Sequence, residues 1–196
     1  MEGDKKFNPT LRLLLTTTEL LIREKGCSKI TMKDIIEHSG ISKGGIYHYV
    51  ESKEELFSLV LQTHLEQVTA QFWQQLEKKE RTESIWIETL FQYVYRLDQD
   101  SVCGEILLYL LHKKDQLIVR QTIRNYYRQV VKTTFKWIQS GQQKVGFSTV
   151  VDGKKMADLF VLISLGLLLR NVIPSAGGHF TTEDFSKLVE GILRSG

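Results

Sequence analysis

The sequence has few of the residues that cross-link or interrupt a chain. Its 196 residues include only two cysteines, Cys27 and Cys103, and only two prolines, Pro9 and Pro174. The cysteines are far apart and lack the spacing of a metal site, so we expect both to be small core residues in a reducing compartment. Because proline is so scarce, long uninterrupted helices are possible.

The sequence also lacks a segment that could enter or cross a membrane. Its start, MEGDKKFNP, contains no apolar stretch of the kind found in signal peptides. The longest apolar run, residues 159–169, is shorter than the roughly 20 residues that a membrane-spanning helix requires. We therefore expect a cytoplasmic protein without a membrane partner. Its 42% of hydrophobic residues are enough for a sizeable core.

Neither sign of charge dominates the chain. The formal net charge is +3, and residues 1–60 contain nine Lys and Arg residues against nine Asp and Glu residues. Bulk charge alone therefore gives no reason to expect nucleic acid as a partner. Any contact with DNA has to come from the arrangement of particular side chains.

No stretch of useful length alternates apolar and polar residues, so we predict no β-sheet. Apolar residues instead recur at helical spacing along most of the chain. This pattern predicts an all-α fold with a three-helix head, residues 1–51, and a larger helical body, residues 52–196. Asp115 and Asp152 are expected to cap two of the body helices, and Gly141 with Gly146 to end the first of these.

Residues 31–57 read TMKDIIEHSGISKGGIYHYVESKEELF and contain two short helical patterns joined by a tight turn. Thr31 is placed to cap the first helix, Gly40 supplies the left-handed residue of the turn, and Ser42 can cap the second helix. The second helix, residues 43–49, has only a small apolar face and presents polar and aromatic side chains: Lys43, Tyr47 and His48. This arrangement is typical of a helix-turn-helix DNA reader.

Several motifs in this region recur in a fixed order: TMKDI at 31–35, GISKG at 40–44, IY at 46–47, and SKEELF at 52–57. With them the chain resembles the N-terminal signature of the tetracycline-repressor (TetR) family over about residues 11–61. The resemblance implies a bacterial or archaeal, dimeric, all-helical transcription repressor. In such a protein the body, here residues 52–196, serves ligand binding and dimerisation.

The same resemblance implies which residues meet the DNA. Lys33 and residues 42–48 would enter or border the major groove, with Lys43 and His48 at the base edges. The glycines of this run would let the backbone approach the duplex closely. Lys53 would offer a backbone amide and a charge to a phosphate. The predicted DNA-binding set is Thr31, Lys33, Ser42, Lys43, Gly44, Gly45, Tyr47, His48 and Lys53.

Residues 40–44 also match the G-x-S-x-G nucleophile elbow of hydrolases, with Ser42 as the nucleophile. That motif requires a strand before the serine and a helix after it. Residues 32–38 have helical spacing instead, so we interpret the match as accidental and expect no enzyme. A serine hydrolase using Ser42 stays open as a remote alternative.

One helix of the body carries cations at exact four-residue spacing, which places them on one face: Arg120, Arg124, Arg128, Lys132 and Lys136. The simplest interpretation is a solvated face whose long side chains cover apolar neighbours. The sharper hypothesis is a surface for an anion, either an acidic inducer such as an acyl-coenzyme A or flanking DNA.

Aromatic residues cluster in the middle helices, where most are expected to be core. In the TetR family these helices enclose a ligand pocket of mixed lining. By resemblance, the side chains expected to face a small-molecule inducer are Phe91, Tyr95, Tyr109, His112, Tyr127 and Phe135. No His pair at i, i+4 and no His-Cys pair occurs, so we predict no metal site and no cofactor.

Residues 156–172 form the most uniformly apolar helical pattern in the chain. A helix that is apolar nearly all round has to be covered on every side, and part of the cover is expected from a second copy. The predicted dimer interface is Leu159, Phe160, Ile163, Gly166 and Leu167.

The expected function is therefore a dimeric, ligand-responsive repressor. It would bind a palindromic operator in double-stranded DNA through its helix-turn-helix, and a small-molecule inducer would release it. The alternative is a helical ligand-binding or interaction module that has lost DNA binding.

Overall fold

The computed structural model describes residues 8–78, 82–99, 101–172 and 179–194. Over these ranges the chain forms α-helices and no strand, so the predicted all-α fold is confirmed. The helices are α1 (Pro9–Lys25), α2 (Met32–Ser39), α3 (Lys43–Tyr47), α4 (Lys53–Lys78), α5 (Glu83–Gln99), α6 (Ser101–His112), α7 (Leu117–Lys144), α8 (Gly153–Val172) and α9 (Thr182–Arg194). None of the helices in these ranges is long and apolar enough to span a membrane.

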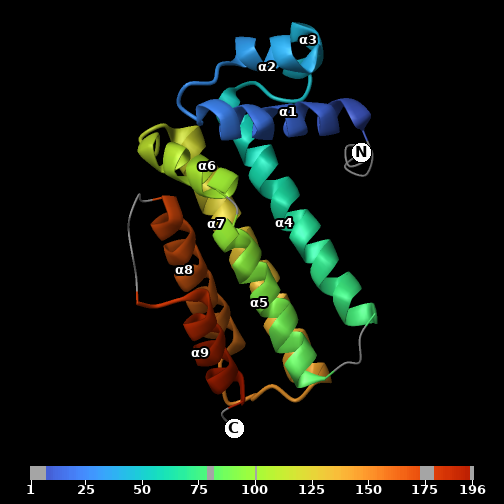
Figure 1. Ribbon diagram of the computed structural model, residues 1–196, viewed down its shortest axis with the longest axis vertical. Helices are drawn as coiled ribbons and strands as arrows, with labels where there is room; N and C mark the ends of the chain where they lie inside the picture. Colours follow the sequence, from blue (N-terminus) through green and yellow to red (C-terminus); the bar gives the residue numbers. More distant parts are fainter. Residues whose placement is uncertain (1–7, 79–81, 100, 173–178, 195–196) are drawn as a thin grey trace.

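The helices are arranged as a small head on an elongated body (Figure 1). Helices α1, α2 and α3 lie together at one end of the molecule. Helix α4 starts beneath them and descends along the body, with α5 and α7 lengthwise beside it and α8 and α9 on the far side of α5 and α7. A single continuous helix therefore joins the head to the far end of the body.

The ends of the first helix follow from local sequence. The Asn8 side chain accepts a hydrogen bond from Thr10 N at 2.9 Å, and Pro9 occupies the first turn, where its missing N–H costs nothing. Gly26 ends the helix with a φ of 77° and donates its own N–H to Ile22 O. A positive φ of this kind favours glycine.

One buried cluster runs through the head and into the body. It joins Leu14 and Ile22 of α1 to Phe57 of α4 and to Ile106 and Leu110 of α6. The head therefore does not close its own core but shares one with the body. The division of the chain after residue 51 stays a prediction.

A second cluster, rich in aromatic residues, fills the lower body. The rings of Phe72 and Trp137 stack with centroids 4.6 Å apart, and Trp86 Nε1 donates to Trp137 O at 3.2 Å. Phe160 of α8 and Phe185 of α9 complete it from the other side. These aromatic side chains are core.

Two predicted helix ends in the body are wrong. Gln116, not Asp115, is the N-cap of α7, and it makes no side-chain cap hydrogen bond. Gly141 does not end α7, which continues to Lys144. A Cβ at Gly141 would collide with the ring of Phe147, so this glycine serves a close approach inside the helix.

Candidate nucleic-acid interface

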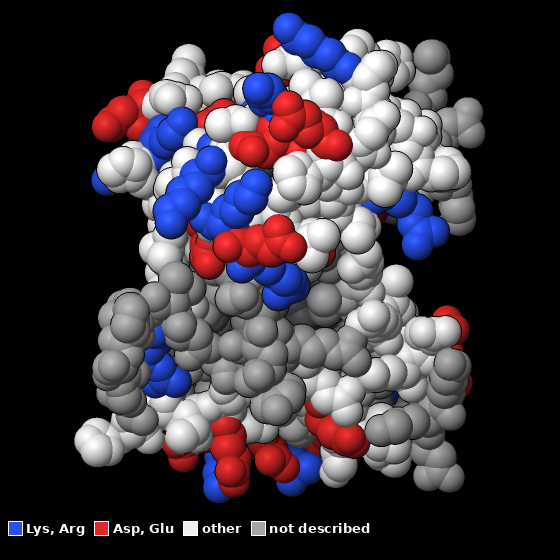
Figure 2. Space-filling model, turned by 45° about the horizontal axis from the view of Figure 1, so that its top comes forward, with Lys and Arg blue, Asp and Glu red and all other residues white. Residues whose placement is uncertain are grey.

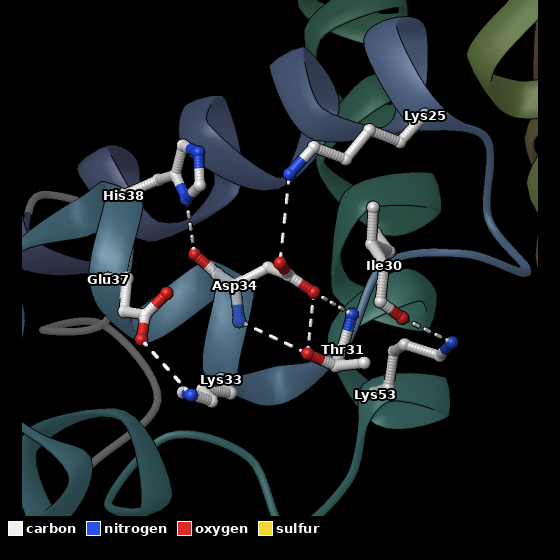
Figure 3. Close-up of polar contacts among 8 residues, drawn as sticks. All are labelled: Lys25, Ile30, Thr31, Lys33, Asp34, Glu37, His38 and Lys53. Carbon is white, nitrogen blue, oxygen red and sulfur yellow. Dashed lines mark hydrogen bonds and ion pairs between the residues drawn. The ribbon is translucent and has the colours of Figure 1, made fainter.

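Helix α2 begins at a complete capping box. Asp34 N donates to Thr31 Oγ1 at 3.2 Å, and the Asp34 carboxylate accepts from Thr31 N at 2.8 Å (Figure 3). Lys25, in the last turn of α1, lies 3.6 Å from the same carboxylate. The hydrogen bonds from the Thr31 side chain and backbone hold the pKa of Asp34 below its usual range, with a smaller contribution from Lys25. The capping box therefore fixes where α2 starts, and the Lys25 contact links this start to the end of α1.

The turn between α2 and α3 takes the predicted form. Gly40 has a φ of 66°, in the left-handed region, and its N–H bonds to Ile36 O at 3.1 Å. Ser39 Oγ accepts from Ile41 N at 3.2 Å, and Ser42 Oγ accepts from Gly45 N at 3.2 Å. Both hydroxyls therefore serve the turn and the start of α3.

Helix α3 is held by one buried side chain and presents the rest outward. Ile46 is fully buried, whereas the side chains around it on the outer face are exposed. The Lys43 ammonium lies 5.8 Å from the centre of the Tyr47 ring, a cation–π distance. Tyr47 itself is 42% exposed. The exposed members of the predicted DNA-binding set are Thr31, Lys33, Ser42, Lys43, Gly44, Tyr47 and His48.

The two glycines of α3 differ in their surroundings. A Cβ at Gly44 would meet no atom within 4 Å, so the backbone there is open to an approaching duplex. At Gly45, however, a Cβ would lie 3.0 Å from Ile41 Cγ2 and 3.2 Å from Ser42 Oγ. The small size of Gly45 is therefore explained by the packing of the turn.

The side chain of Lys53 does not lie where it was expected. Its ammonium donates to Cys27 O at 3.1 Å and to Ile30 O at 2.8 Å, inside the head (Figure 3 shows the Ile30 contact). Burial, assisted by the nearby charge of Lys113, holds the pKa of Lys53 below its usual range. The expected contact between the Lys53 charge and a phosphate is therefore wrong. The ammonium instead holds the α1–α2 connection against the start of α4.

Charges of both signs cover the head. Lys33 pairs with Glu37 at 3.6 Å on the outer face of α2, and His38 Nδ1 bonds to Asp34 O at 2.7 Å. Figure 2 shows basic side chains interspersed with acidic ones over the end that carries the head. A DNA contact on this surface depends on geometry rather than on a continuous basic patch, as the balanced composition indicated.

A polar clamp joins the first turn of α4 to the end of α6. Glu54 Oε1 accepts from Tyr109 OH at 2.7 Å and from Lys113 Nζ at 2.9 Å. Burial alone would raise the pKa of Glu54, but the hydrogen bonds from Lys113 and Tyr109 outweigh it and hold the pKa below its usual range. No local sequence pattern indicates this clamp, because Tyr109 and Lys113 lie more than 50 residues from Glu54.

A second polar chain crosses the junction through three helices. His64 of α4 lies with Nδ1 3.3 Å from Cys103 Sγ of α6 and with Nε2 3.1 Å from Glu19 Oε1 of α1. Together with the clamp at Glu54, it ties the head to both α4 and α6.

The predicted ligand-contacting residues do not converge on one pocket. Phe91 lines an open groove of about 750 Å³ between α5 and α9. Tyr109 belongs to the Glu54 clamp, and His112 is exposed at the end of α6. Tyr127 and Phe135 line a different groove between α7 and α8. The side chain of the sixth residue, Tyr95, lies outside the described residues.

The predicted dimer residues divide into two sets. Phe160 and Leu167 are buried against their own subunit, which corrects their place in the predicted interface. Leu159 is 40% exposed, and a Cβ at Gly166 would meet no atom within 4 Å. The exposed stripe of α8 therefore passes through Leu159 and Gly166, with half-buried Ile163 at its edge.

Ser42 does not have the geometry of a nucleophile elbow. It follows helix α2 rather than a strand, and its hydroxyl caps α3. Among the described residues no group of three His, Cys, Asp or Glu side chains could hold a metal ion.

Fold and site together define the class: an all-α protein that presents a helix-turn-helix at one end of a helical body. Residues 14–60 match the sequence model described as "Bacterial regulatory proteins, tetR family". Over these residues the chain is therefore similar to the DNA-binding segment of the tetR family of bacterial regulatory proteins.

A curated relative is similar in sequence, and solved structures are similar in fold. The HTH-type transcriptional regulator YfiR of Bacillus subtilis is 26% identical over 161 residues, which cover 79% of this chain and 76% of YfiR. A TetR-family regulator from Syntrophomonas wolfei has the same fold with a TM-score of 0.72 at 20% identity, over 95% of this chain and 93% of that one. The regulator FadR of Bacillus subtilis, solved with stearoyl-CoA, has a TM-score of 0.67 at 16% identity, over 94% of this chain and 98% of FadR.

Proposed function

We propose that this protein is a dimeric repressor that binds a palindromic operator in double-stranded DNA and is released by a small-molecule inducer. The observation that carries the proposal is the outward presentation of Lys43, Tyr47 and His48 around the buried anchor Ile46. A short rigid helix with an exposed polar and aromatic face is what reading the major groove requires.

The roles at the DNA follow from side-chain chemistry. Lys43 would donate to guanine acceptors, and His48 would reach a neighbouring base edge. Tyr47 would donate its hydroxyl to a phosphate, with Lys33 and Thr31 at the rim of the groove. The open backbone of Gly44 would let the duplex approach, and the amide of Lys53 would cap a phosphate at the start of α4.

The dimer is proposed to form through the exposed apolar stripe of α8 and the neighbouring face of α9. Leu159 and Leu162 are 40% and 54% exposed, and Leu188 of α9 is 44% exposed. Helices α8 and α9 of two copies would pack as a four-helix bundle about a two-fold axis. That symmetry would set the recognition helices about 35 Å apart, which matches successive major grooves.

Release would follow from a ligand that prefers a body in which α4 is displaced. FadR, which has this fold, is solved with stearoyl-CoA, and by that precedent we place an organic inducer in the body. The groove between α5 and α9, which contains Phe91, is the proposed site. The Glu54 clamp would carry the change from α6 to the first turn of α4, and coupling of about 1–3 kcal/mol is typical of such regulators.

Fluorescence anisotropy with a labelled duplex from the protein's own upstream region tests the proposal. Tyr47→Ala is expected to weaken binding roughly tenfold. Lys187→Ala, in α9, is the matched control and should leave affinity unchanged, because this exposed lysine pairs only with the neighbouring Glu183 among the described residues. The midpoint of thermal unfolding should be unchanged in both variants.

Repeating the titration over a series of salt concentrations separates a repressor from a module that has lost DNA binding. Phosphate contacts release counterions, so affinity should fall steeply as salt rises. A flat salt response, or equal losses in Tyr47→Ala and Lys187→Ala, would contradict the proposal.

A further inference from the structure

Helix α7 carries only one sign of charge. Its 28 residues include Arg120, Arg124, Arg128, Lys132 and Lys136 at four-residue spacing and contain no Asp or Glu. All five side chains are exposed, and from Arg124 to Lys136 none of the four pairs with an acid among the described residues. Like charges four residues apart destabilise a helix, so repulsion within the stripe lowers the stability of α7. A bound anion would remove this repulsion.

A groove lies where two members of this stripe meet helix α8. It has a volume of about 310 Å³ and is lined by Tyr127, Arg128, Val131, Lys132 and Phe135 of α7 and by Lys154 and Asp158 of α8. This volume is at the lower end of small-molecule sites, which are roughly 300–1,000 Å³. Three cations from two helices therefore surround a floor made by Val131, Phe135 and the Tyr127 ring.

The walls of the groove are held in place by the α7–α8 connection. A Cβ at Gly153, the first residue of α8, would lie 3.3 Å from Phe135 Cε2, so the missing side chain lets the ring lie against the helix start. Gln142 Nε2 donates to Ser148 O at 2.9 Å and to Val151 O at 3.1 Å. Asp152 Oδ1 accepts from Lys154 N at 2.9 Å and so fixes the first turn of α8.

We propose that this groove binds a single-chain amphiphilic anion, with a phosphate head held by Arg128, Lys132 and Lys154 and an apolar tail on Val131 and Phe135. Charge complementarity selects the head, because the rim supplies three cations. The apolar floor selects a tail, because an inorganic anion would leave Val131 and Phe135 in water. Binding requires neither the operator nor the groove at Phe91, so the inference is independent of the proposed function.

The position of the groove argues against flanking DNA as its occupant. Helix α8 begins at the end of the body that lies away from the head, just after the α7–α8 connection (Figure 1). A duplex held by α3 would lie at the opposite end of the molecule. The cations of this groove are therefore available to a small molecule rather than to the operator.

Asp158 is the one carboxylate in the groove. Tyr127 OH donates to Asp158 Oδ1 at 2.6 Å, which directs this acid toward the phenol. Its charge opposes an anionic head, so removing it should tighten binding. A rise in affinity on removal of this carboxylate is specific to the proposed site, since the affinity of a diffuse basic surface would change only weakly when one exposed acid is removed.

Isothermal titration calorimetry with n-octyl phosphate, on the protein without DNA, tests the proposal. One saturable site per chain is expected. Octyl glucoside supplies the tail without the charge, inorganic phosphate supplies the head without the tail, and octyltrimethylammonium reverses the head charge. Each of these is expected to bind at least about tenfold more weakly, as expected when one charged contact is lost.

Two double variants with the same change in net charge form the decisive comparison. Arg128→Gln with Lys132→Gln removes two rim cations and should lower the affinity for octyl phosphate by about tenfold or more. Arg124→Gln with Lys136→Gln removes two stripe cations that do not line the groove and should change affinity less than about threefold. Asp158→Asn should raise the affinity. All these side chains are exposed, so the variants are expected to fold, and the midpoint of thermal unfolding verifies this.

Each of three outcomes would overturn the proposal. They are the absence of saturable octyl phosphate binding, equal losses in the two double variants, and equal affinity for inorganic phosphate or octyl glucoside. None of them bears on operator binding, which is measured separately with duplex DNA.

Discussion

At the scale of single residues, the difference between the expected and observed roles comes from partners far away in sequence. The family resemblance gave the charge of Lys53 a contact with a phosphate. Its ammonium instead bonds to Cys27 O and Ile30 O, which are 26 and 23 residues earlier. No local pattern encodes these two carbonyls, because they come together only when the α1–α2 connection folds against α4.

The Tyr127–Asp158 pair gives a prediction at this scale. The hydrogen bond to Asp158, followed by burial, raises the pKa of Tyr127 to about 12. The folded-state pKa therefore lies above the unfolded value of about 10. The hydrogen bond to Asp158 therefore stabilises the folded protein fully below the unfolded-state pKa of Tyr127. This stabilisation is lost as the pH rises through the folded-state pKa.

Asp158→Asn should bring the pKa of Tyr127 down toward about 10. Titration of phenolate absorbance, with Tyr127→Phe used to isolate this residue from the other tyrosines, measures the change. An unchanged titration curve in the Asp158→Asn variant would mean that the carboxylate does not determine the pKa of this phenol.

At the scale of elements, the caps and the turn of the helix-turn-helix were predicted correctly, whereas the predicted Asp115 cap of α7 was wrong. Thr31 and Ser42 cap α2 and α3 as expected, and Gly40 adopts the left-handed conformation that the turn required. These features depend on residues within four positions of one another, so the sequence alone specifies them. The role of Gly141 was missed because it depends on Phe147 folding back onto α7, which is a tertiary contact.

Two glycine substitutions should therefore destabilise the protein for different reasons. Gly40→Ala places a Cβ on a residue with a φ of 66° but meets no neighbouring atom within 4 Å. Its cost should be the backbone strain alone, about 1–2 kcal/mol. Gly141→Ala favours the helix locally by about 1 kcal/mol, yet the collision with Phe147 should reverse the sign and cost about 1–3 kcal/mol.

Chemical denaturation of both variants measures these free energies of unfolding. Phe147→Leu should partly rescue Gly141→Ala and should not rescue Gly40→Ala. A stabilised Gly141→Ala variant would show that the ring of Phe147 is not a fixed neighbour of α7.

At the scale of the whole molecule, the sequence specified the order of the parts better than their contacts. The head and the body lie where the apolar periodicity placed them. The predicted pocket residues, however, are divided among the α5–α9 groove, the Glu54 clamp and the α7–α8 groove. Helical periodicity tells which side of a helix is apolar, but it does not tell which neighbouring helix that side meets.

The exposed stripe of α8 leads to a prediction for the assembly. Leu162 is 54% exposed on α8, so Leu162→Glu should leave each subunit folded and place charges in the proposed interface. Light scattering after size exclusion should report a monomer, while circular dichroism keeps its helical signal. Lys154→Glu, an acid substituted elsewhere on α8, is the control and should stay dimeric. A dimeric Leu162→Glu variant would place the interface elsewhere.

The central claim is that two copies of α3 are presented at a separation that a duplex accepts. Hydroxyl-radical footprinting on the protein's own upstream DNA tests it most directly. We expect two symmetric protected regions with centres about 10 base pairs apart, or a multiple of that, both weakened together by Tyr47→Ala and by Leu162→Glu. A single protected half-site, or protection that survives both substitutions, would contradict it.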